Sequence, residues 1–172
     1  MSPDEFRNSV IPMGRKLYTF AFRFLNNREE SEDVAQEVMT RLWEKRDELS
    51  RYNSAEALAM TMTRNLCLDR LRHRKYEGYE EEPEEVLKLS ADEPSRELEN
   101  AEASEMIKAI IARLKEPYKS AIILRDLEGM TYEESSEITG LTINALRVNL
   151  SRARKMVREE MIKIYSYGSE RS

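Results

Sequence analysis

The sequence has few of the residues that build metal centres, disulfide frameworks and nucleotide-binding loops. Among its 172 residues there is one cysteine, Cys67, and one histidine, His73, which excludes both a disulfide and a Cys/His zinc cluster. The five glycines stand apart, at positions 14, 78, 129, 140 and 168, so neither a P-loop nor a dinucleotide-binding turn can be drawn. No cofactor and no metal are expected, and an enzyme is the least favoured class of function.

Long apolar runs are also missing. Unbroken runs reach about four residues, as in the AIIL of residues 121–124, whereas a membrane-spanning helix needs about 20. The N-terminus has two early acids, Asp4 and Glu5, and no hydrophobic signal segment follows them. Together with the single cysteine, these features predict a cytoplasmic protein that does not insert into a membrane.

Charged residues are abundant but unevenly distributed. They make up 35% of the chain with a net charge of −5, so any surface for nucleic acid must be local. Five basic residues and one acid lie between Arg64 and Lys75, near the possible stacking groups Tyr52 and Tyr76. A basic helix end is also what the helix dipole favours. Residues 76–105 then contain twelve acids and two bases, which predicts a flexible acidic linker.

Apolar residues recur at helical spacing on both sides of this acidic stretch. The predicted fold class is all-α, with two small helical domains joined by the flexible linker. In the fourth helix, Asn53 and Glu56 are placed as a capping box, and Leu58 and Met62 should face inward. The expected helices are one around Phe6 and Val10, then 14–25, 28–49, 54–75, 95–115 and a helix from Pro117 to Gly129.

The third of these helices has two different sides. Its apolar side includes Val34, Val38 and Leu42, which predicts packing against the core. The other side is polar and acidic, and a face of this kind is usually just solvated. Its residues are Asp33, Gln36, Glu37, Thr40 and Glu44.

The stretch from Thr131 to Arg158 predicts two helices joined by a tight turn. Thr131 and Glu134 form a capping box for the first helix, Gly140 suits a left-handed end, and Thr142 caps the second. Such an arrangement is typical of a DNA-binding helix-turn-helix, although it is not unique to one. The stripe expected in the core comprises Ile143, Leu146, Leu150, Ala153, Val157, Met161 and Ile164.

The opposite face of that second helix is basic and polar. Arginine and lysine suit phosphates, Asn and Arg suit base edges, and an outward valine suits a thymine methyl group. A solvated basic helix packed on a neighbour would show the same pattern. The face comprises Asn144, Val148, Ser151, Arg152 and Lys155, with Arg147 and Arg158 on one flank and Asn149 on the other.

Several motifs resemble those of one family in order and spacing. They are EDVAQEVMTRLWEK at 32–45, TRNLCLDRLR at 63–72, LRDLE at 124–128, GMTYEESSEITGL at 129–141 and LSRARK at 150–155. The chain resembles an extracytoplasmic-function (ECF) sigma factor of the bacterial sigma-70 family, with regions two and four. The resemblance implies a protein that directs core RNA polymerase to specific promoters. Its expected domains are region two (1–76), an acidic linker (77–94), region four (95–165) and a tail (166–172).

For region two, the resemblance implies that Asp33, Gln36 and Glu37 bind the clamp helices of the polymerase beta-prime subunit. The 49–53 loop and the basic face of the next helix would separate the strands of the minus-ten element. Leu58 and Met60 stand where many relatives have Trp and Tyr, so Tyr52 becomes the expected stacking group. The residues expected at minus-ten DNA are Tyr52, Arg64, Arg70, Arg72 and Arg74.

For region four, the resemblance implies reading of the minus-thirty-five element, contact with the beta flap, and regulation by an anti-sigma factor. Arg154 lies near the core stripe of this helix. Two alternatives remain for its side chain: contact with a DNA phosphate, or an ion pair within the protein. The alternative function is a helix-turn-helix regulator whose N-terminal half senses a ligand or dimerises. The residues expected at this element are Asn144, Arg147, Val148, Asn149, Ser151, Arg152 and Lys155.

Overall fold

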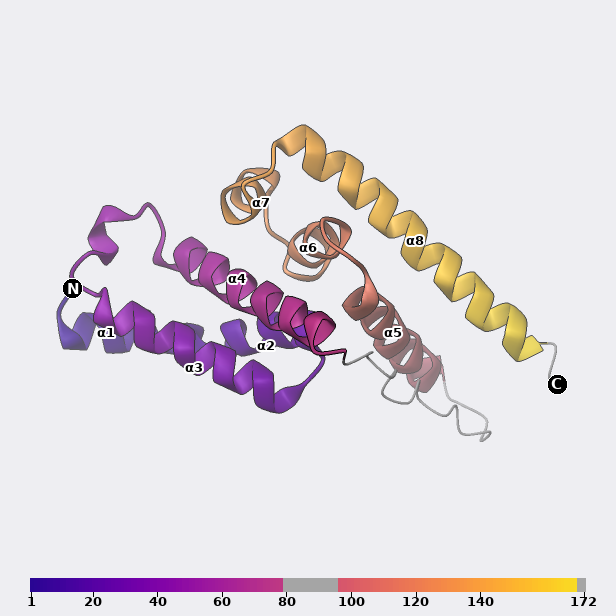
Figure 1. Ribbon diagram of the computed structural model, residues 1–172, viewed down its shortest axis with the longest axis horizontal. Coiled ribbons are helices and arrows are strands. Elements are labelled where there is room, and N and C mark those ends of the chain that lie inside the picture. The colour runs from indigo at the N-terminus through magenta and orange to yellow at the C-terminus, as the bar shows by residue number, and fades with distance from the viewer. Residues whose placement is uncertain (79–95, 170–172) are drawn as a thin grey trace.

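The computed structural model describes residues 1–78 and 96–169, and every regular element in these ranges is a helix. The helices form two units, one from α1–α4 and one from α5–α8 (Figure 1). The predicted all-α fold with two helical domains is therefore confirmed. Apart from Glu77 and Gly78, the predicted linker lies outside the described residues.

The first unit is built around three long helices. Its elements are α1 (Pro3–Ser9), the 3-10 turn η1 (Ile11–Met13), α2 (Gly14–Leu25), α3 (Arg28–Glu44), the 3-10 turn η2 (Leu49–Arg51) and α4 (Ala55–Tyr76). Asn26 ends α2 in the left-handed region, at φ 47°. Asn27 then caps α3 by accepting a hydrogen bond from the Glu30 amide at 2.9 Å. These two asparagines set the angle between α2 and α3.

The core of the first unit lies between α2, α3 and α4. Phe20 and Phe24 of α2 pack edge to face with centroids 5.1 Å apart, and Val38 and Leu42 of α3 are fully buried. On α4, Leu58 and Met62 pack against the core as predicted, and so does Leu66, although all three are only half-buried. The fully buried residues of α4 are Ala59, Met60, Thr63 and Cys67.

Two further features of α4 were not predicted from the sequence. Its cap is Ser54, whose hydroxyl accepts from the Ala57 amide at 3.1 Å, and not Asn53. Adjacent Asn and Ser are both good caps, so the sequence alone could not choose between them. Furthermore, α4 packs against α2 and α3 on one side and against α7 on another. Because α4 is covered on two sides, a single apolar stripe does not account for all of its buried residues.

The second unit contains α5 (Arg96–Arg113), α6 (Tyr118–Ile122), the π-helical turn η3 (Ile123–Leu127), α7 (Tyr132–Thr139) and α8 (Ile143–Ser169). The predicted capping box is confirmed, with Thr131 accepting from the Glu134 amide at 3.1 Å and Glu134 accepting from the Thr131 amide at 2.9 Å. Gly140 ends α7 at φ 74°, as predicted. Helix α8 continues to Ser169, into the stretch expected to be a tail.

The central part of the predicted α8 stripe is confirmed. Leu146, Leu150, Ala153 and Val157 are buried, whereas Ile143, Met161 and Ile164 are half-buried. Past Val157 the helix is less covered, although Met161 and Ile164 still pack against the core. None of the described helices combines the length and hydropathy that crossing a membrane requires.

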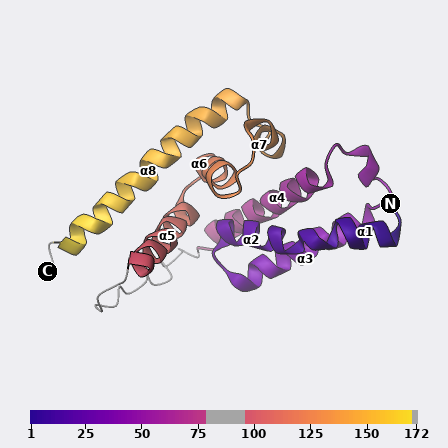
Figure 2. The same cartoon turned by 180° about the vertical axis from the view of Figure 1, so that it is seen from behind.

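The two units pack against each other. Helix α4 contacts α7, and α2 contacts α5, an arrangement visible from the back of the molecule in Figure 2. Lys119 of α6 is buried, and its ammonium donates to the Phe24 carbonyl at the end of α2 at 2.8 Å. Arg23 of α2 and Glu128, just past η3, form an ion pair at 3.4 Å.

Candidate functional site

The acidic face of α3 is exposed. Val34, Ala35 and Val38 are buried, so the opposite side of the helix faces solvent. Asp33 and Gln36 are exposed, and Glu37 is half-buried with its carboxylate accepting from Arg41 at 2.5 Å. Within residues 1–78 and 96–169, Asp33 and Glu44 of this face form no ion pair, whereas Glu37 is paired with Arg41 of the same helix.

A groove of about 790 Å³ lies beside this face, between α2 and α3. Met39 and Gln36 line it from α3, and Arg15 and Tyr18 line it from α2. Tyr18 also packs near the exposed Phe22, with centroids 6.1 Å apart. Sequence reasoning missed the contribution of α2. The spacing of Tyr18 and Phe22, four residues apart on one side of the helix, was the signal available.

The residues expected at minus-ten DNA do not form one cluster. Tyr52 is 43% exposed and precedes α4, whereas Arg70, Arg72 and Arg74 lie near its other end. A helix of 22 residues is about 33 Å long, so Tyr52 and these arginines are far apart. Tyr76, which is 93% exposed, is the aromatic residue beside the basic end of α4.

Two arginines at the basic end of α4 already have acidic partners. Arg72 forms an ion pair with Asp69 on the same helix. Arg74 pairs with Glu30 of α3 and donates to the Leu25 carbonyl at 3.3 Å. Arg70 is half-buried. The positive charge of this surface is therefore partly neutralised within the first unit.

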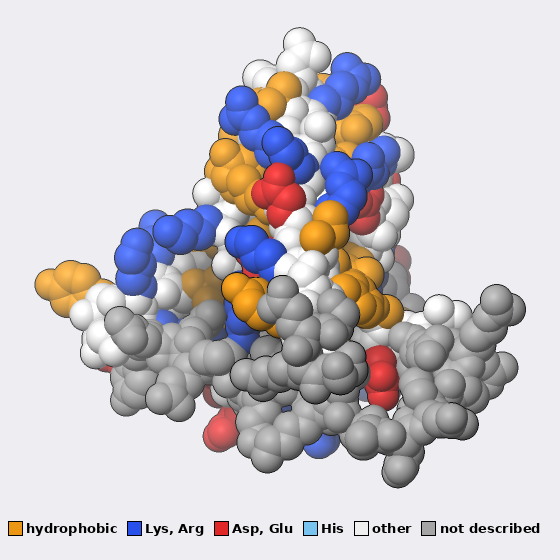
Figure 3. Space-filling model, turned by 90° about the vertical axis from the view of Figure 1, so that its right-hand side faces the viewer, with side chains coloured by type: hydrophobic (Ala, Val, Ile, Leu, Met, Phe, Trp, Pro, Cys, Tyr) orange, Lys and Arg blue, Asp and Glu red, His pale blue; other side chains and the backbone are white. Residues whose placement is uncertain are grey.

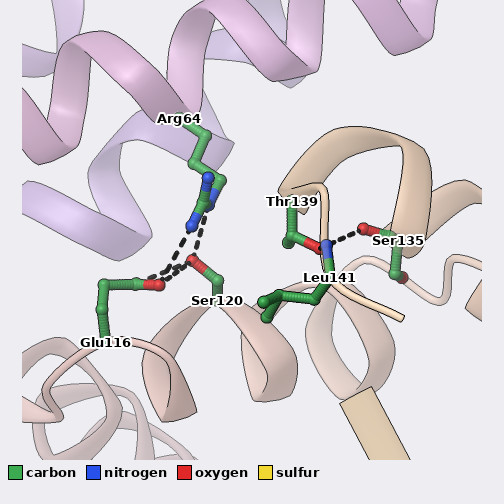
Figure 4. Close-up of polar contacts among 6 residues, drawn as sticks. All are labelled: Arg64, Glu116, Ser120, Ser135, Thr139 and Leu141. Carbon is green, nitrogen blue, oxygen red and sulfur yellow. Dashed lines mark hydrogen bonds and ion pairs between the residues drawn. The ribbon is translucent and has the colours of Figure 1, made fainter. Parts of the chain in front are cut away.

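Arg64 is covered by the second unit. Its side chain is 13% exposed, its Nε donates to the Ser120 hydroxyl at 2.8 Å, and its Nη2 donates to Glu116 at 3.2 Å. Ser120 in turn donates to the Glu116 carboxylate at 2.7 Å (Figure 4). A residue expected to contact DNA thus binds a hydroxyl of α6 and the carboxylate of Glu116, which lies just before that helix.

The turn before α8 is fixed by side-chain hydrogen bonds. The Thr139 hydroxyl donates to the Ser135 carbonyl at 2.8 Å and accepts from the Leu141 amide at 3.2 Å (Figure 4). The Ser136 hydroxyl donates to the Leu141 carbonyl at 2.6 Å. Thr142 caps α8 as predicted, accepting from the Ala145 amide at 3.1 Å.

Most residues expected at minus-thirty-five DNA are exposed on the N-terminal half of α8. Viewed toward the end of that helix, Lys and Arg side chains gather on the upper part of the molecule (Figure 3). Asn149 is half-buried, and Lys155 forms an ion pair with Glu159 at 3.8 Å. The exposed residues are Asn144, Arg147, Val148, Ser151, Arg152 and Lys155.

Two interactions join α8 to the residues before it: one decides between the two alternatives for Arg154, and the other was not predicted. Arg154 donates two hydrogen bonds to Asp126, at 2.8 and 2.7 Å. These bonds to Asp126 raise the pKa of Arg154 and make it an internal pair. In addition, Arg147 and Arg125 both lie over the ring of Tyr132, at 5.1 and 4.0 Å from its centroid.

Within the part of the chain that the structure describes, no group of three or more His, Cys, Asp or Glu side chains is placed to hold a metal ion. Burial raises the pKa of the Cys67 thiol to about 12, so the thiol stays protonated at neutral pH. The described surface therefore has one acidic face, on α3, and two groups of basic residues, one near the C-terminal end of α4 and one on α8.

Both units match known protein families. Residues 12–76 match sigma-70 region 2 and residues 104–157 match sigma-70 region 4, which together cover more than half of the chain. The chain is similar to the ECF RNA polymerase sigma factor SigE of Mycolicibacterium smegmatis, with 26% identity over 152 residues, 86% of this chain and 58% of SigE. It is also similar to the ECF RNA polymerase sigma factor SigW of Bacillus subtilis, with 26% identity over 92% of this chain and 89% of SigW.

Solved structures show the same fold. The sigma factor RpoE of Bartonella quintana, in complex with the anti-sigma factor NepR, has a TM-score of 0.69 and 25% identity, covering 90% of this chain and 95% of RpoE. CnrH, in complex with the cytosolic domain of CnrY, has a TM-score of 0.68 and 19% identity, covering 94% of this chain and 90% of CnrH. The second likeness concerns the fold alone.

Proposed function

The chain belongs to the sigma-70 family of RNA polymerase sigma factors, in the extracytoplasmic-function form with regions 2 and 4, and we propose that it directs core RNA polymerase to specific promoters. The observation that supports this function is the presence of both region matches, in order, on one chain. The proposed domains are region 2 (1–76), the linker (77–94), region 4 (95–165) and the tail (166–172). In this role the chain acts in the cytoplasm and catalyses no reaction itself.

The proposed polymerase surface is the exposed face of α3. Asp33, Gln36 and Glu37 would bind the clamp helices of the beta-prime subunit, because acids and an amide suit the basic residues of a partner helix. The adjacent groove would extend this surface, since Tyr18 and Met39 offer apolar area beside the charges. Region 4 would contact the beta flap. An anti-sigma factor is a further proposed partner, since the matched RpoE structure holds a sigma factor with such a partner.

The proposed promoter contacts are divided between the two units. In region 2, Tyr52, Arg64, Arg70, Arg72 and Arg74 would bind and melt the minus-ten element. In region 4, Arg147, Asn149 and Ser151 would meet base edges with Asn144 and Val148, while Arg152 and Lys155 would meet phosphates. Because Glu116 and Ser120 cover Arg64, the promoter-bound form requires the two units to move apart.

Reconstitution with core polymerase tests this function. We expect the purified protein to bind core enzyme tightly and to make it start transcription at specific promoters. The isolated protein should bind promoter duplex weakly, since its net charge is −5 and Arg64 is covered. Tight, sequence-specific binding of duplex by the isolated protein, without association with polymerase, would support a helix-turn-helix regulator instead.

The basic end of α4 should matter more for opening the promoter than for finding it. Changing Arg70, Arg72 and Arg74 to alanine should reduce strand separation at the minus-ten element, because these residues lie on α4 of region 2 and not on the recognition helix α8. Permanganate reactivity of thymines in that element measures the separation. Normal melting by the triple variant would move this role to the loop that contains Tyr52.

A further inference from the structure

Tyr132 lies at a junction of three elements in region 4. It is the first residue of α7, and the Thr131–Glu134 capping box fixes its backbone. Arg125 of η3 lies over its ring at 4.0 Å from the centroid and donates from Nη1 to the Met130 carbonyl. Arg147 of α8 lies over the same ring at 5.1 Å. The ring thus connects the turn before α7 to a residue of the recognition helix.

The charge around this ring is unbalanced. Arg125 and Arg147 both contact the Tyr132 ring, and Arg147 forms no ion pair within residues 1–78 and 96–169. Arg154 provides the contrast, because two hydrogen bonds to Asp126 neutralise its charge. Two guanidinium groups over one ring repel each other unless an acceptor or an anion joins them. Arg147 is exposed, so its guanidinium remains available to a ligand with hydrogen-bond acceptors.

A guanidinium that reads a base must be correctly oriented. Bidentate recognition of guanine requires the plane of the arginine fork to match the base edge. A free arginine loses rotamer freedom when it adopts that orientation, whereas one already held against a ring loses less. The Tyr132 ring is itself held by Arg125 and is half-buried against the core. It is therefore a rigid platform for Arg147.

We propose that Tyr132 is a positioning residue for promoter recognition, which holds Arg147 in the orientation that reads a base of the minus-thirty-five element. The inference rests on the proposed function and adds a residue of α7 to the determinants of sequence preference. Tyr132 acts through Arg147, so its replacement should alter preference at the same promoter position as Arg147→Ala. A purely stabilising role for Tyr132 would instead weaken all promoters by one common factor.

The test compares replacements that keep or remove the aromatic ring. Transcription by reconstituted polymerase is measured on a promoter library with a randomised minus-thirty-five element. Tyr132→Phe keeps the ring and should keep the wild-type preferences. Tyr132→Met keeps apolar bulk without the ring and should reduce discrimination at the Arg147 position by about two- to fivefold, the scale of an exposed cation–π contact. Adding Tyr132→Met to Arg147→Ala should cause no further loss at that position.

Two controls separate positioning from folding. Asp126→Ala removes the partner of Arg154 and should lower the melting temperature without changing base preference. Tyr132→Leu, a second apolar replacement that helices accept, must behave as Tyr132→Met does. The proposal is overturned if Tyr132→Met keeps the wild-type preferences, or if it weakens every promoter equally. If the wild-type protein does not direct core polymerase to start transcription at specific promoters, the proposed function itself is overturned.

Discussion

Replacing both Asp33 and Glu37 with lysine is expected to abolish binding to core RNA polymerase while the helical fold remains intact. Asp33 is exposed and Glu37 is half-buried on α3, with their side chains directed away from the core. Like charges placed opposite each other in an interface cost several kcal/mol, so affinity should fall on the order of a thousandfold or more. Competition with the wild-type protein for core enzyme measures the loss.

The matched control places the same charge change elsewhere. Glu133→Lys with Glu137→Lys alters two exposed acids of α7, away from the α3 face, and should leave binding to the clamp helices unchanged. Val38→Asp gives the opposite contrast, because it buries an unpaired charge in the core of region 2 and should unfold it. If the Asp33 and Glu37 double variant competes like wild type, the clamp-helix assignment is wrong.

Local signals allowed much of region 4 to be predicted. The capping box at Thr131, the left-handed Gly140 and the cap at Thr142 each involve residues within about three positions of one another. Interactions of this range depend little on the rest of the fold, so the sequence contains the information that they need. The same reasoning explains why α2 ends at Leu25, as predicted, just before Asn26.

The contacts that modify the candidate sites are between residues distant in sequence. Arg64 and Ser120 are 56 positions apart, and Arg154 and Asp126 are 28 apart. Helical periodicity predicts which face of a helix is covered but not which side chain covers it. The sequence therefore predicted a basic face on α4 without showing that α6 lies over Arg64.

Two ion pairs between the described residues of the two units have the same polarity, although Lys119 of region 4 donates in the opposite sense to a region 2 carbonyl. Region 2 contributes Arg23 and Arg64, and region 4 contributes the carboxylates of Glu128 and Glu116. Burial raises the pKa of Glu128, although the nearby Arg23 partly opposes that shift. Of these two arginines, Arg64 is the one proposed to bind promoter DNA, and the Glu116 carboxylate satisfies its guanidinium as a phosphate of DNA would.

Replacing Glu116 with lysine should separate the two units and expose Arg64. The Glu116 carboxylate accepts from Arg64 at 3.2 Å, in a site where the arginine side chain is 13% exposed. Removing a partner at such a site costs about 1–3 kcal/mol. A second cation at about 4 Å adds repulsion of about 4 kcal/mol at an effective dielectric constant of about 20. The packed arrangement should therefore become less populated by a factor on the order of a hundred or more.

Two measurements detect this separation. Small-angle scattering should show a larger radius of gyration for Glu116→Lys, and the isolated protein should bind DNA with a pre-melted minus-ten element about tenfold or more tightly, because Arg64 becomes available. Glu105→Lys on α5 changes the net charge equally but alters an exposed acid that pairs with Lys108 on its own helix. Equal radii and equal DNA affinities for the two variants would mean that Glu116 does not restrict access to Arg64.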